Sequence, residues 1–205
     1  MADIIPDPET IITELYPRGS LTRELLLQHG EQVAAKALAV LDRAAWLDAD
    51  RTFIHQAAML HDIGIGRTHC PSLGCTGPLP YVCHGVEGRT ILNRLGLIRH
   101  AWVCERHVGT GITARQIKAQ NIPLPLREML PITVEERLIC YADKFFSKSD
   151  SGRHEKSVDE IVSGLTRYGT DNALRFDRLH RFFTVEPAVS GRLAATGHQR
   201  ETTPC

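Results

Sequence analysis

The amino-acid sequence predicts an all-α fold, built as a single bundle of helices. Several segments repeat apolar residues at the three- to four-residue spacing of a buried helix face, and helix-capping residues precede most of these segments. No segment alternates apolar and polar residues well enough to predict a β-strand. No internal repeat and no linker divides the 205 residues. We therefore expect one domain over residues 1–205, with its core at about 20–150.

The first two predicted helices are defined by their N-caps. Asp7 is a typical N-cap and Pro8 suits the first helical position, which predicts a short helix ending at about Leu15. Ser20 can cap a long second helix over residues 21–47. His29 lies on the inward stripe of this helix, which is formed by Leu25, Leu26, Val33, Ala37 and Val40.

A third helix is predicted over about 50–62, where Gly64 and Gly66 end it. Residues 67–82 are rich in Gly, Pro and Cys and predict a loop. Three prolines likewise exclude a regular helix from the segment NIPLPLREMLP. Further helices are expected at about 83–96, 98–107, 134–148 and 157–184.

Capping boxes mark the starts of the last two predicted helices. Thr133 is followed three residues later by Glu136, and Ser157 is followed in the same way by Glu160. The tail after about residue 187 contains mainly small and polar residues, and we expect it to be loosely held.

The composition excludes several classes of partner. Lys and Arg total 24, as do Asp and Glu, so no basic surplus indicates a nucleic-acid polymer or an anionic membrane. No apolar run approaches the ~20 residues of a membrane span, and the N-terminus lacks the features of a secretory signal. Six cysteines without an export signal predict reduced thiols and a cytoplasmic protein.

Six residues of the metal-ligand type fall on inward helix faces or at helix ends. They are, in chain order, His29, His61, Asp62, His84, His107 and Asp143. A single histidine on an apolar face is usually a core residue with one hydrogen bond. Six such positions on successive helices instead indicate a shared site. Adjacent helical residues point about 100° apart, so His61 and Asp62 can reach that site only beyond their helix end.

This order of residues, with the sequence HDIG at 61–64, resembles the HD-domain superfamily of metal-dependent phosphohydrolases. The resemblance covers roughly residues 20–150, and the segments RHVGTGIT and EERLICYADK are similar to bacterial HD-type dinucleotide polyphosphate hydrolases. It implies a helical HD domain with two divalent metal ions. The basic ligand set would be His29, His61, Asp62 and Asp143, the additional ligands of the binuclear members would be His84 and His107, and Asp62 would bridge the ions as the catalytic carboxylate.

Imidazole and carboxylate ligands suit iron or manganese, with zinc as an alternative. Two divalent ions with two carboxylates and a shared hydroxide keep a positive charge that suits a phosphoryl group. We expect metal-dependent hydrolysis of a phosphate ester or anhydride in a small nucleotide-like substrate. Two alternatives stay open. The same ligand order occurs in HD-type di-iron oxygenases, and a metal-bound or degenerate regulatory module could bind nucleotides without turnover, although the presence of all six ligands counts against degeneracy. The sequence does not give the oligomeric state.

Cationic and hydroxyl side chains near the ligands are candidates for binding phosphate oxygens. Arg127 lies in the proline-stiffened loop, Lys144 follows Asp143 directly, and Thr110 follows His107 by three residues. We rank Arg127 above Lys144, because a stiff loop loses less entropy when it presents a guanidinium group. Thr113 is a weaker candidate, for which a capping role is favoured.

Other histidines and cysteines have more ordinary interpretations. His55 and His100 are expected to be structural rather than partners of the ligands. A structural zinc site would need tighter paired spacings than those of His69, Cys70, Cys75 and Cys83. We expect the loop that holds them to fold over the metal site as a lid.

Overall fold

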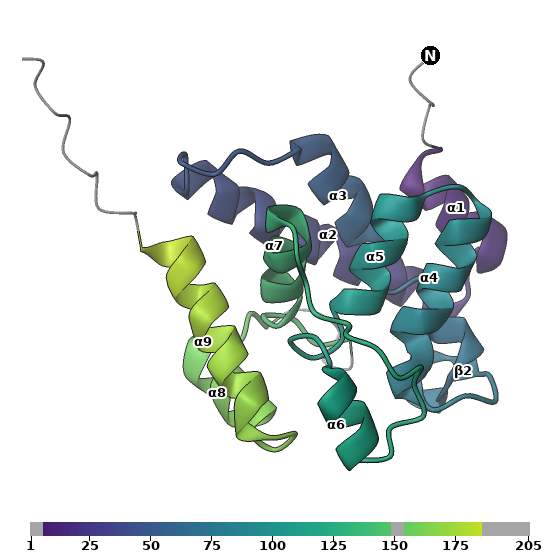
Figure 1. The fold of residues 1–205 in the computed structure, drawn as a ribbon. Helices are drawn as coiled ribbons and strands as arrows, with labels where there is room; N and C mark the ends of the chain where they lie inside the picture. The colour runs from purple at the N-terminus through teal and green to yellow at the C-terminus, as the bar shows by residue number, and fades with distance from the viewer. Residues whose placement is uncertain (1–5, 149–153, 186–205) are drawn as a thin grey trace, which may run out of the picture.

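The computed structural model describes residues 6–148 and 154–185, and these ranges confirm the all-α prediction (Figure 1). Their α-helices are α1 (Pro8–Leu15), α2 (Leu21–Arg43), α3 (Arg51–Leu60), α4 (His84–Arg94), α5 (Ile98–Arg106), α6 (Ala114–Ala119), α7 (Val134–Asp143), α8 (Val158–Thr166) and α9 (Thr170–Thr184). The predicted loop contains three short 3-10 turns, η1 (Ile65–Arg67), η2 (Pro71–Leu73) and η3 (Tyr81–Cys83). It also holds two antiparallel strands that the sequence did not predict, β1 (His69–Cys70) and β2 (Cys75–Thr76).

The predicted N-caps hold the starts of the helices. The Asp7 carboxylate accepts a hydrogen bond from the Thr10 amide at 3.0 Å, and the Ser20 hydroxyl accepts one from Arg23 at 3.3 Å. The capping box at Ser157 is complete. These contacts satisfy amide groups that have no partner within the first helical turn.

Only one of the two hydrogen bonds of the capping box predicted at Thr133 is formed. The Thr133 hydroxyl accepts the amide of Glu136 at 3.2 Å, as expected. The Glu136 carboxylate does not return to Thr133, because it accepts the Ile132 amide at 2.7 Å and the Arg106 guanidinium at 2.8 Å. A long-range ion pair to α5 thus replaces one local contact.

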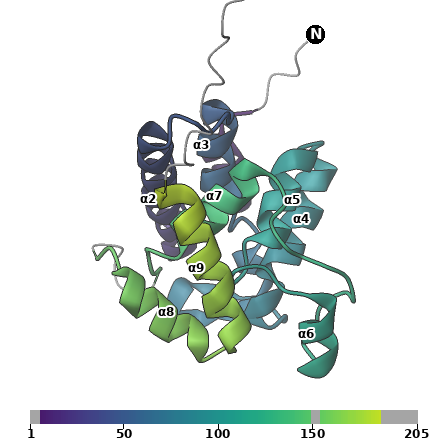
Figure 2. The same cartoon turned by 60° about the vertical axis from the view of Figure 1, so that its left-hand side comes forward.

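The prediction of one C-terminal helix over about 157–184 was wrong. The chain forms α8 and α9 instead, with Gly169 at φ 113° between them. This left-handed backbone conformation favours glycine and reverses the chain, so that α8 packs beside α9 (Figure 2). The sequence also missed α6, and α2 ends at Arg43 rather than at residue 47. The predicted loose tail after residue 187 lies outside the described residues.

Two clusters of buried apolar side chains fix the helices that later hold the site. Helix α7 packs against α2, α3, α5 and α9, with Leu138 and Phe176 fully buried in the first cluster. The second cluster joins α1, the start of α2, the end of α3 and the α4–α5 pair, and it buries Leu60 and Ile63 on either side of His61 and Asp62. Apolar packing therefore positions the end of α3 where its polar residues face the interior.

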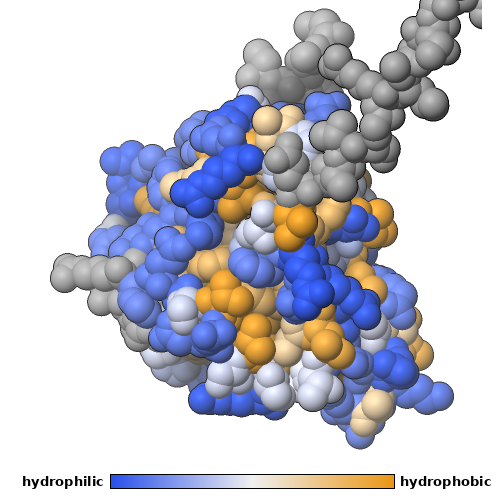
Figure 3. Space-filling model, turned by 90° about the vertical axis from the view of Figure 1, so that its left-hand side faces the viewer, coloured by the Kyte–Doolittle hydropathy of each residue, from blue (hydrophilic) through white to orange (hydrophobic). Residues whose placement is uncertain are grey.

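The face of the molecule in Figure 3 carries orange hydrophobic residues in separate groups among blue hydrophilic ones. Individually exposed apolar side chains of α9, such as Leu174 and Phe182, are ordinary for a protein surface. None of the described helices combines the length and the apolar character that crossing a membrane requires.

Candidate metal centre

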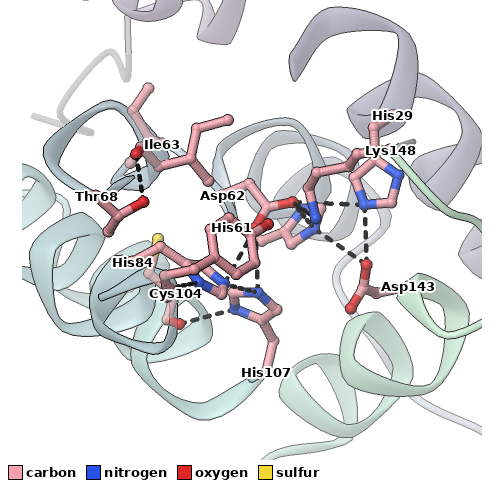
Figure 4. Close-up of polar contacts among 12 residues, drawn as sticks. His29, His61, Asp62, Ile63, Thr68, His84, Cys104, His107, Asp143 and Lys148 are labelled. Atoms are coloured by element: carbon pink, nitrogen blue, oxygen red, sulfur yellow. Dashed lines mark hydrogen bonds and ion pairs between the residues drawn. The ribbon is translucent and has the colours of Figure 1, made fainter. Parts of the chain in front are cut away.

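The structure brings all six predicted ligands together in the interior (Figure 4). They come from α2, the end of α3, the start of α4, the end of α5 and the last residue of α7, and none is more than 8% exposed. Their ligand atoms form two groups within which all atoms lie within 4.8 Å of one another. The first group is His29, His61, Asp62 and Asp143, and the second is Asp62, His84 and His107.

Asp62 belongs to both groups because its two carboxylate oxygens face in different directions. Oδ2 lies 2.9 Å from His61 Nε2 and 3.4 Å from His29 Nε2. Oδ1 lies 3.4 Å from the Nε2 atoms of both His84 and His107. A carboxylate in this orientation can offer one oxygen to each of two cations.

Each group also has contacts that do not involve Asp62. In the first group, Asp143 Oδ1 lies 2.9 Å from His29 Nε2 and 3.5 Å from His61 Nε2. In the second group, the Nε2 atoms of His84 and His107 are 3.2 Å apart. The second group has only one carboxylate, so its ligand set is richer in nitrogen.

Backbone carbonyl groups hold three of the four imidazole rings in one orientation. His61, His84 and His107 each place Nδ1 beside the carbonyl oxygen three residues earlier, at 2.6, 2.7 and 2.8 Å. A carbonyl oxygen can only accept, so Nδ1 carries a proton, and in the neutral form of each ring Nε2 has its lone pair toward the centre. This arrangement supports metal binding through Nε2.

Gly64 of the HDIG sequence is required by packing rather than by its backbone conformation. Its φ is −87°, which any residue can adopt. A Cβ atom at this position would lie 2.1 Å from the His84 carbonyl oxygen and 2.3 Å from the Gly88 amide nitrogen. The absent side chain thus lets α4 approach the turn after α3, which places His84 beside Asp62.

Tyr16 holds the same turn from the opposite side. Its hydroxyl donates to the Ile63 carbonyl at 2.7 Å and accepts from the Gly66 amide at 3.0 Å. Burial raises the pKa of Tyr16 to about 12, so the hydroxyl keeps the proton that it donates. A Cβ atom on Gly66 would lie 2.5 Å from the Tyr16 ring. Both glycines therefore permit close approach of other groups.

The two carboxylates of the centre are ionised in spite of their burial. Burial raises the pKa of Asp62, but the neighbouring charges of His61 and Lys148 outweigh it and hold that pKa well below its usual range. Burial acts in the same way on the pKa of Asp143, where Lys144 and the hydrogen bond from His29 outweigh it. The centre therefore carries two negative charges that attract cations.

The histidines divide into three neutral rings and one that carries a proton. Burial lowers the pKa of His29 to about 4 and that of His84 to about 3, and it lowers the pKa of His107 as well. Burial also lowers the pKa of His61, but the charge of Asp62 and the contact with Asp143 raise it overall to about 9. A metal ion bound in the first group must displace this proton.

Metal affinity is consequently expected to rise with pH. Below pH 9 the His61 proton competes with the metal, so affinity should fall roughly tenfold for each pH unit. His29 and His84, with pKa values of about 4 and about 3, are neutral between pH 5.5 and 7.5 and add no further dependence there. A competition titration with a chromophoric chelator between pH 5.5 and 7.5 measures the effect, and an affinity that stays constant there contradicts it.

The donor set fits a metal ion. Within the described residues, the buried Asp62 Oδ1 has no hydrogen-bond partner, and its neighbours are the two imidazole nitrogens already named. Four imidazoles and two carboxylates are typical ligands of iron, manganese or zinc. The His/Asp cluster can therefore hold a metal.

A cavity of ≈ 480 Å³ opens onto the centre. Its wall includes the ligands His84, His107 and Asp143 and the cations Lys144 and Lys148. Cys70 and Tyr81 of the predicted lid segment line an adjoining cavity of ≈ 520 Å³ together with Asp143. The segment thus borders the site.

Two lysines approach the ligands, and the sequence predicted one of them. Lys144 curls back as expected, with Nζ 2.6 Å from Asp143 Oδ2 and 3.2 Å from the His107 carbonyl oxygen. Lys148 was missed, although its Nζ lies 2.6 Å from Asp62 Oδ2. The chain has left α7 before Lys148, so no helical spacing in the sequence connects this lysine to the ligands.

The structure places Arg127 and Thr110 away from the cavity that contains the ligands. The Arg127 guanidinium forms an ion pair with Glu105, whose carboxylate is fully buried and is also bound by Arg89 at 2.6 Å. The Thr110 hydroxyl donates to the Asn172 carbonyl at 3.2 Å and fastens the loop after α5 to α9. Neither residue lines this cavity, and the ranking of Arg127 above Lys144 is reversed. Thr113 caps α6, as favoured.

Replacing Arg127 with alanine is therefore expected to reduce stability rather than metal content. The buried Glu105 carboxylate would lose one of two cationic partners, at a cost of roughly 1–2 kcal/mol. Urea unfolding measures this change. Arg115→Ala is the matched control, since its pair with Asp171 is exposed and contributes little. Equal stabilities of the two variants would contradict the assignment.

The other histidines and cysteines considered from the sequence lie outside the two groups of candidate ligands. His55 is half-buried, and His100 is buried with its ring 4.8 Å from that of Phe53. The five cysteines in the described ranges are free thiols. Within the same ranges, the two groups around Asp62 are the ones with ligand atoms close enough to hold a metal, so the cysteine-containing segment forms no such group.

The fold and the site define a helical protein with a buried histidine–aspartate metal centre. The chain belongs to the HD-domain family, since a sequence model of that domain matches residues 26–147. This range includes all six ligands. The HD domain associates the chain with metal-dependent hydrolases and supports an enzymatic role.

Three relatives extend this comparison. Proteins of Thermoplasma volcanium and Picrophilus torridus, both named tRNA (cytidine(56)-2'-O)-methyltransferase, are 29% identical over 184 residues and 28% identical over 177 residues. These alignments cover 89% and 86% of the chain but 48% and 46% of the relatives, so the chain spans about half their length. An uncharacterized protein of Methanocaldococcus jannaschii is 30% identical over 148 residues, or 70% of the chain and 76% of that protein. No solved structure matches the chain.

Proposed function

We propose that the protein is a metal-dependent hydrolase that cleaves a phosphate ester or anhydride bond in a small nucleotide-like substrate. The observation that carries this proposal is the orientation of Asp62, whose two oxygens face separate groups of histidine nitrogens. Such a carboxylate suits a pair of divalent ions. Iron or manganese is favoured by the ligands, with zinc as an alternative.

The first ion would be held by His29, His61 and Asp143, the second by His84 and His107, and Asp62 would be shared. Two such ions lower the pKa of a bound water and neutralise charge on a phosphoryl group. The protein orients the rings through the backbone contacts at Nδ1. Asp62 is the catalytic carboxylate in this proposal.

Lys144 and Lys148 add positive charge on the wall of the same cavity. Among the described residues that line it, Asp143 is the sole carboxylate. An anionic phosphoryl group would therefore meet metal ligands and two ammonium groups, and the one carboxylate on this wall, Asp143, is itself a proposed metal ligand. This distribution supports a phosphorylated substrate over a neutral one.

The substrate is proposed to be a small molecule in the cytoplasm, without a nucleic-acid polymer or a membrane as partner. Equal numbers of basic and acidic residues support this choice. The methyltransferase activity in the names of two relatives is not assigned to this protein, because about half of each relative lies outside the match. The shared part includes the HD-domain residues, and these suit hydrolysis.

The proposal is tested with protein purified without oxygen and loaded separately with iron, manganese or zinc. Hydrolysis is measured on a panel of phosphorylated compounds, as inorganic phosphate released from nucleoside mono- and diphosphates and as nucleoside phosphates formed from a dinucleotide polyphosphate and a cyclic nucleotide. Metal-dependent hydrolysis of at least one compound is expected. Oxygen consumption by the iron-loaded protein without phosphate release would favour an oxygenase and contradict the proposal. Binding without turnover would contradict it in favour of a regulatory module.

Lys148→Ala is expected to lower kcat/KM for the best phosphorylated substrate roughly 10- to 100-fold, as for one lost charge-assisted contact. Lys148→Arg should recover part of this loss, and the metal content of both variants should stay unchanged. Lys118→Ala on the exposed side of α6 serves as the control. Normal hydrolysis by Lys148→Ala would show that Lys148 does not contribute to substrate binding or turnover.

A further inference from the structure

We propose that Tyr168 is the binding surface for a planar heterocyclic ring of the substrate, and that the substrate is a phosphomonoester carrying such a ring. This inference rests on the proposed phosphohydrolase function and names the class of its substrate. The cavity beside the metal centre would hold two parts of one molecule, with the phosphoryl group at the metals and the ring against Tyr168.

The wall of the cavity combines polar and apolar side chains. The proposed metal ligands and the two lysines contribute charged and polar groups. The same wall contains the apolar side chains of Val82, Val108, Ile112, Ile122 and Leu165. A volume of ≈ 480 Å³ is typical of a small-molecule site with apolar walls and a few polar groups. The apolar part of the wall therefore suits the organic part of a substrate.

Tyr168 stands at the junction of this cavity with its neighbour of ≈ 520 Å³. At 75%, it is the most exposed large hydrophobic side chain in the described part of the chain. Its ring makes no aromatic or cation–π contact with another described residue. Both faces of the ring are thus available for stacking on a ligand.

The backbone of Tyr168 is fixed although its side chain is exposed. Its amide donates to the Leu165 carbonyl at 3.0 Å, and its carbonyl accepts the Asn172 side-chain amide at 2.9 Å. The Asn172 oxygen is itself bound by Arg175 at 2.6 Å. A ring presented from a fixed backbone loses less conformational entropy when it binds a flat partner.

The charges around the two cavities favour a monoester over a diester. Lys144, Lys148 and Lys156 line the cavity that Tyr168 shares, and Asp143 is the sole carboxylate among its described lining residues. A phosphomonoester brings up to two negative charges and three terminal oxygens, whereas a diester brings one charge and two. Lys144 and Lys148 pair with Asp143 and Asp62, so metal ions bound by these carboxylates would leave both ammonium groups, together with Lys156, to match the more highly charged group.

The experiment compares adenosine 5'-monophosphate with glycerol phosphate on the metal-loaded protein and on Tyr168→Ala, Tyr168→Phe and Leu174→Ala. Leu174 is an exposed apolar residue of α9 outside both cavity linings and is the control. Tyr168→Ala should raise KM for the nucleotide roughly 10-fold or more, as for one lost stacking contact, with kcat within about twofold. Glycerol phosphate kinetics should not change, and Tyr168→Phe should behave like the original protein.

A second readout is the dissociation constant of adenosine, which lacks the phosphate and is measured by calorimetry. Tyr168→Ala should weaken adenosine binding by the same factor as KM. Equal kcat/KM for the two substrates in the original protein, or an unchanged KM in Tyr168→Ala, would overturn the inference and leave the hydrolase proposal standing. Absence of phosphate release from every monoester would overturn the monoester part of the inference, while metal-dependent cleavage of a diester or an anhydride would leave the hydrolase proposal standing. Turnover of none of the phosphorylated compounds would overturn the hydrolase proposal, and adenosine binding that Tyr168→Ala leaves unchanged would overturn the ring-binding role of Tyr168.

Discussion

Replacing Asp62 with alanine is expected to abolish metal-dependent phosphate release, with a loss of at least about 10³-fold, because it removes a ligand from both metal groups at once. Each Asp62 oxygen faces a different pair of histidine nitrogens, at 2.9–3.4 Å. No other carboxylate among the described residues lies in both groups. Metal content should fall together with activity, which elemental analysis of the same samples measures.

Two further variants separate this effect from general unfolding. Asp62→Asn keeps the shape of the side chain and removes its charge, so it should also lose metal while its circular dichroism stays native. Asp42→Asn removes an exposed carboxylate that pairs with Arg51, and it should retain metal and activity. Full metal content in Asp62→Asn and Asp62→Ala would exclude Asp62 as the shared ligand.

Gly64→Ala is expected to destabilise the protein by at least about 3 kcal/mol, through overpacking against backbone rather than side chain. The added Cβ atom would meet the His84 carbonyl oxygen at 2.1 Å and the Gly88 amide nitrogen at 2.3 Å. Neither atom can move without shifting α4, which also displaces His84 from Asp62. Urea unfolding and metal titration should both report the change.

Gly164→Ala provides the matched control for this prediction. Gly164 lies inside α8, and a Cβ atom there would meet nothing within 4 Å. Alanine is favoured over glycine in a helix interior, so this variant should be more stable by roughly 0.5–1 kcal/mol. If Gly64→Ala were as stable as Gly164→Ala, the close approach of α4 would not explain the glycine of HDIG.

The fold was predictable wherever a local signal defined an element. Asp7, Ser20 and Ser157 cap helices as expected, because capping depends on residues three positions apart. The break at Gly169 was not recognised, since a glycine inside a helical pattern is often tolerated and only the packing of α9 on α8 makes the reversal favourable. The short strand pair β1–β2 depends on contacts within a cysteine-containing loop that has no alternating pattern.

The six ligands could be predicted because each lies at a position where burial would otherwise be costly. The cations around them were harder to assign. Arg127 is held by Glu105, which is 22 residues earlier in the chain and which the sequence pattern did not connect to it. Lys148 reaches Asp62 from a segment 86 residues later, and no local spacing encodes that contact. Long-range ion pairs such as these therefore could not be predicted from the sequence.

Anomalous diffraction from manganese-loaded crystals tests most directly whether Asp62 is shared by two metal ions. Data collected on both sides of the manganese absorption edge should show two peaks in each chain, ~3.5–4 Å apart. One peak should lie among His29, His61 and Asp143, and the other should lie beside His84 and His107, with Asp62 between them. A single peak in each chain, or a second peak away from His84 and His107, would contradict the binuclear centre.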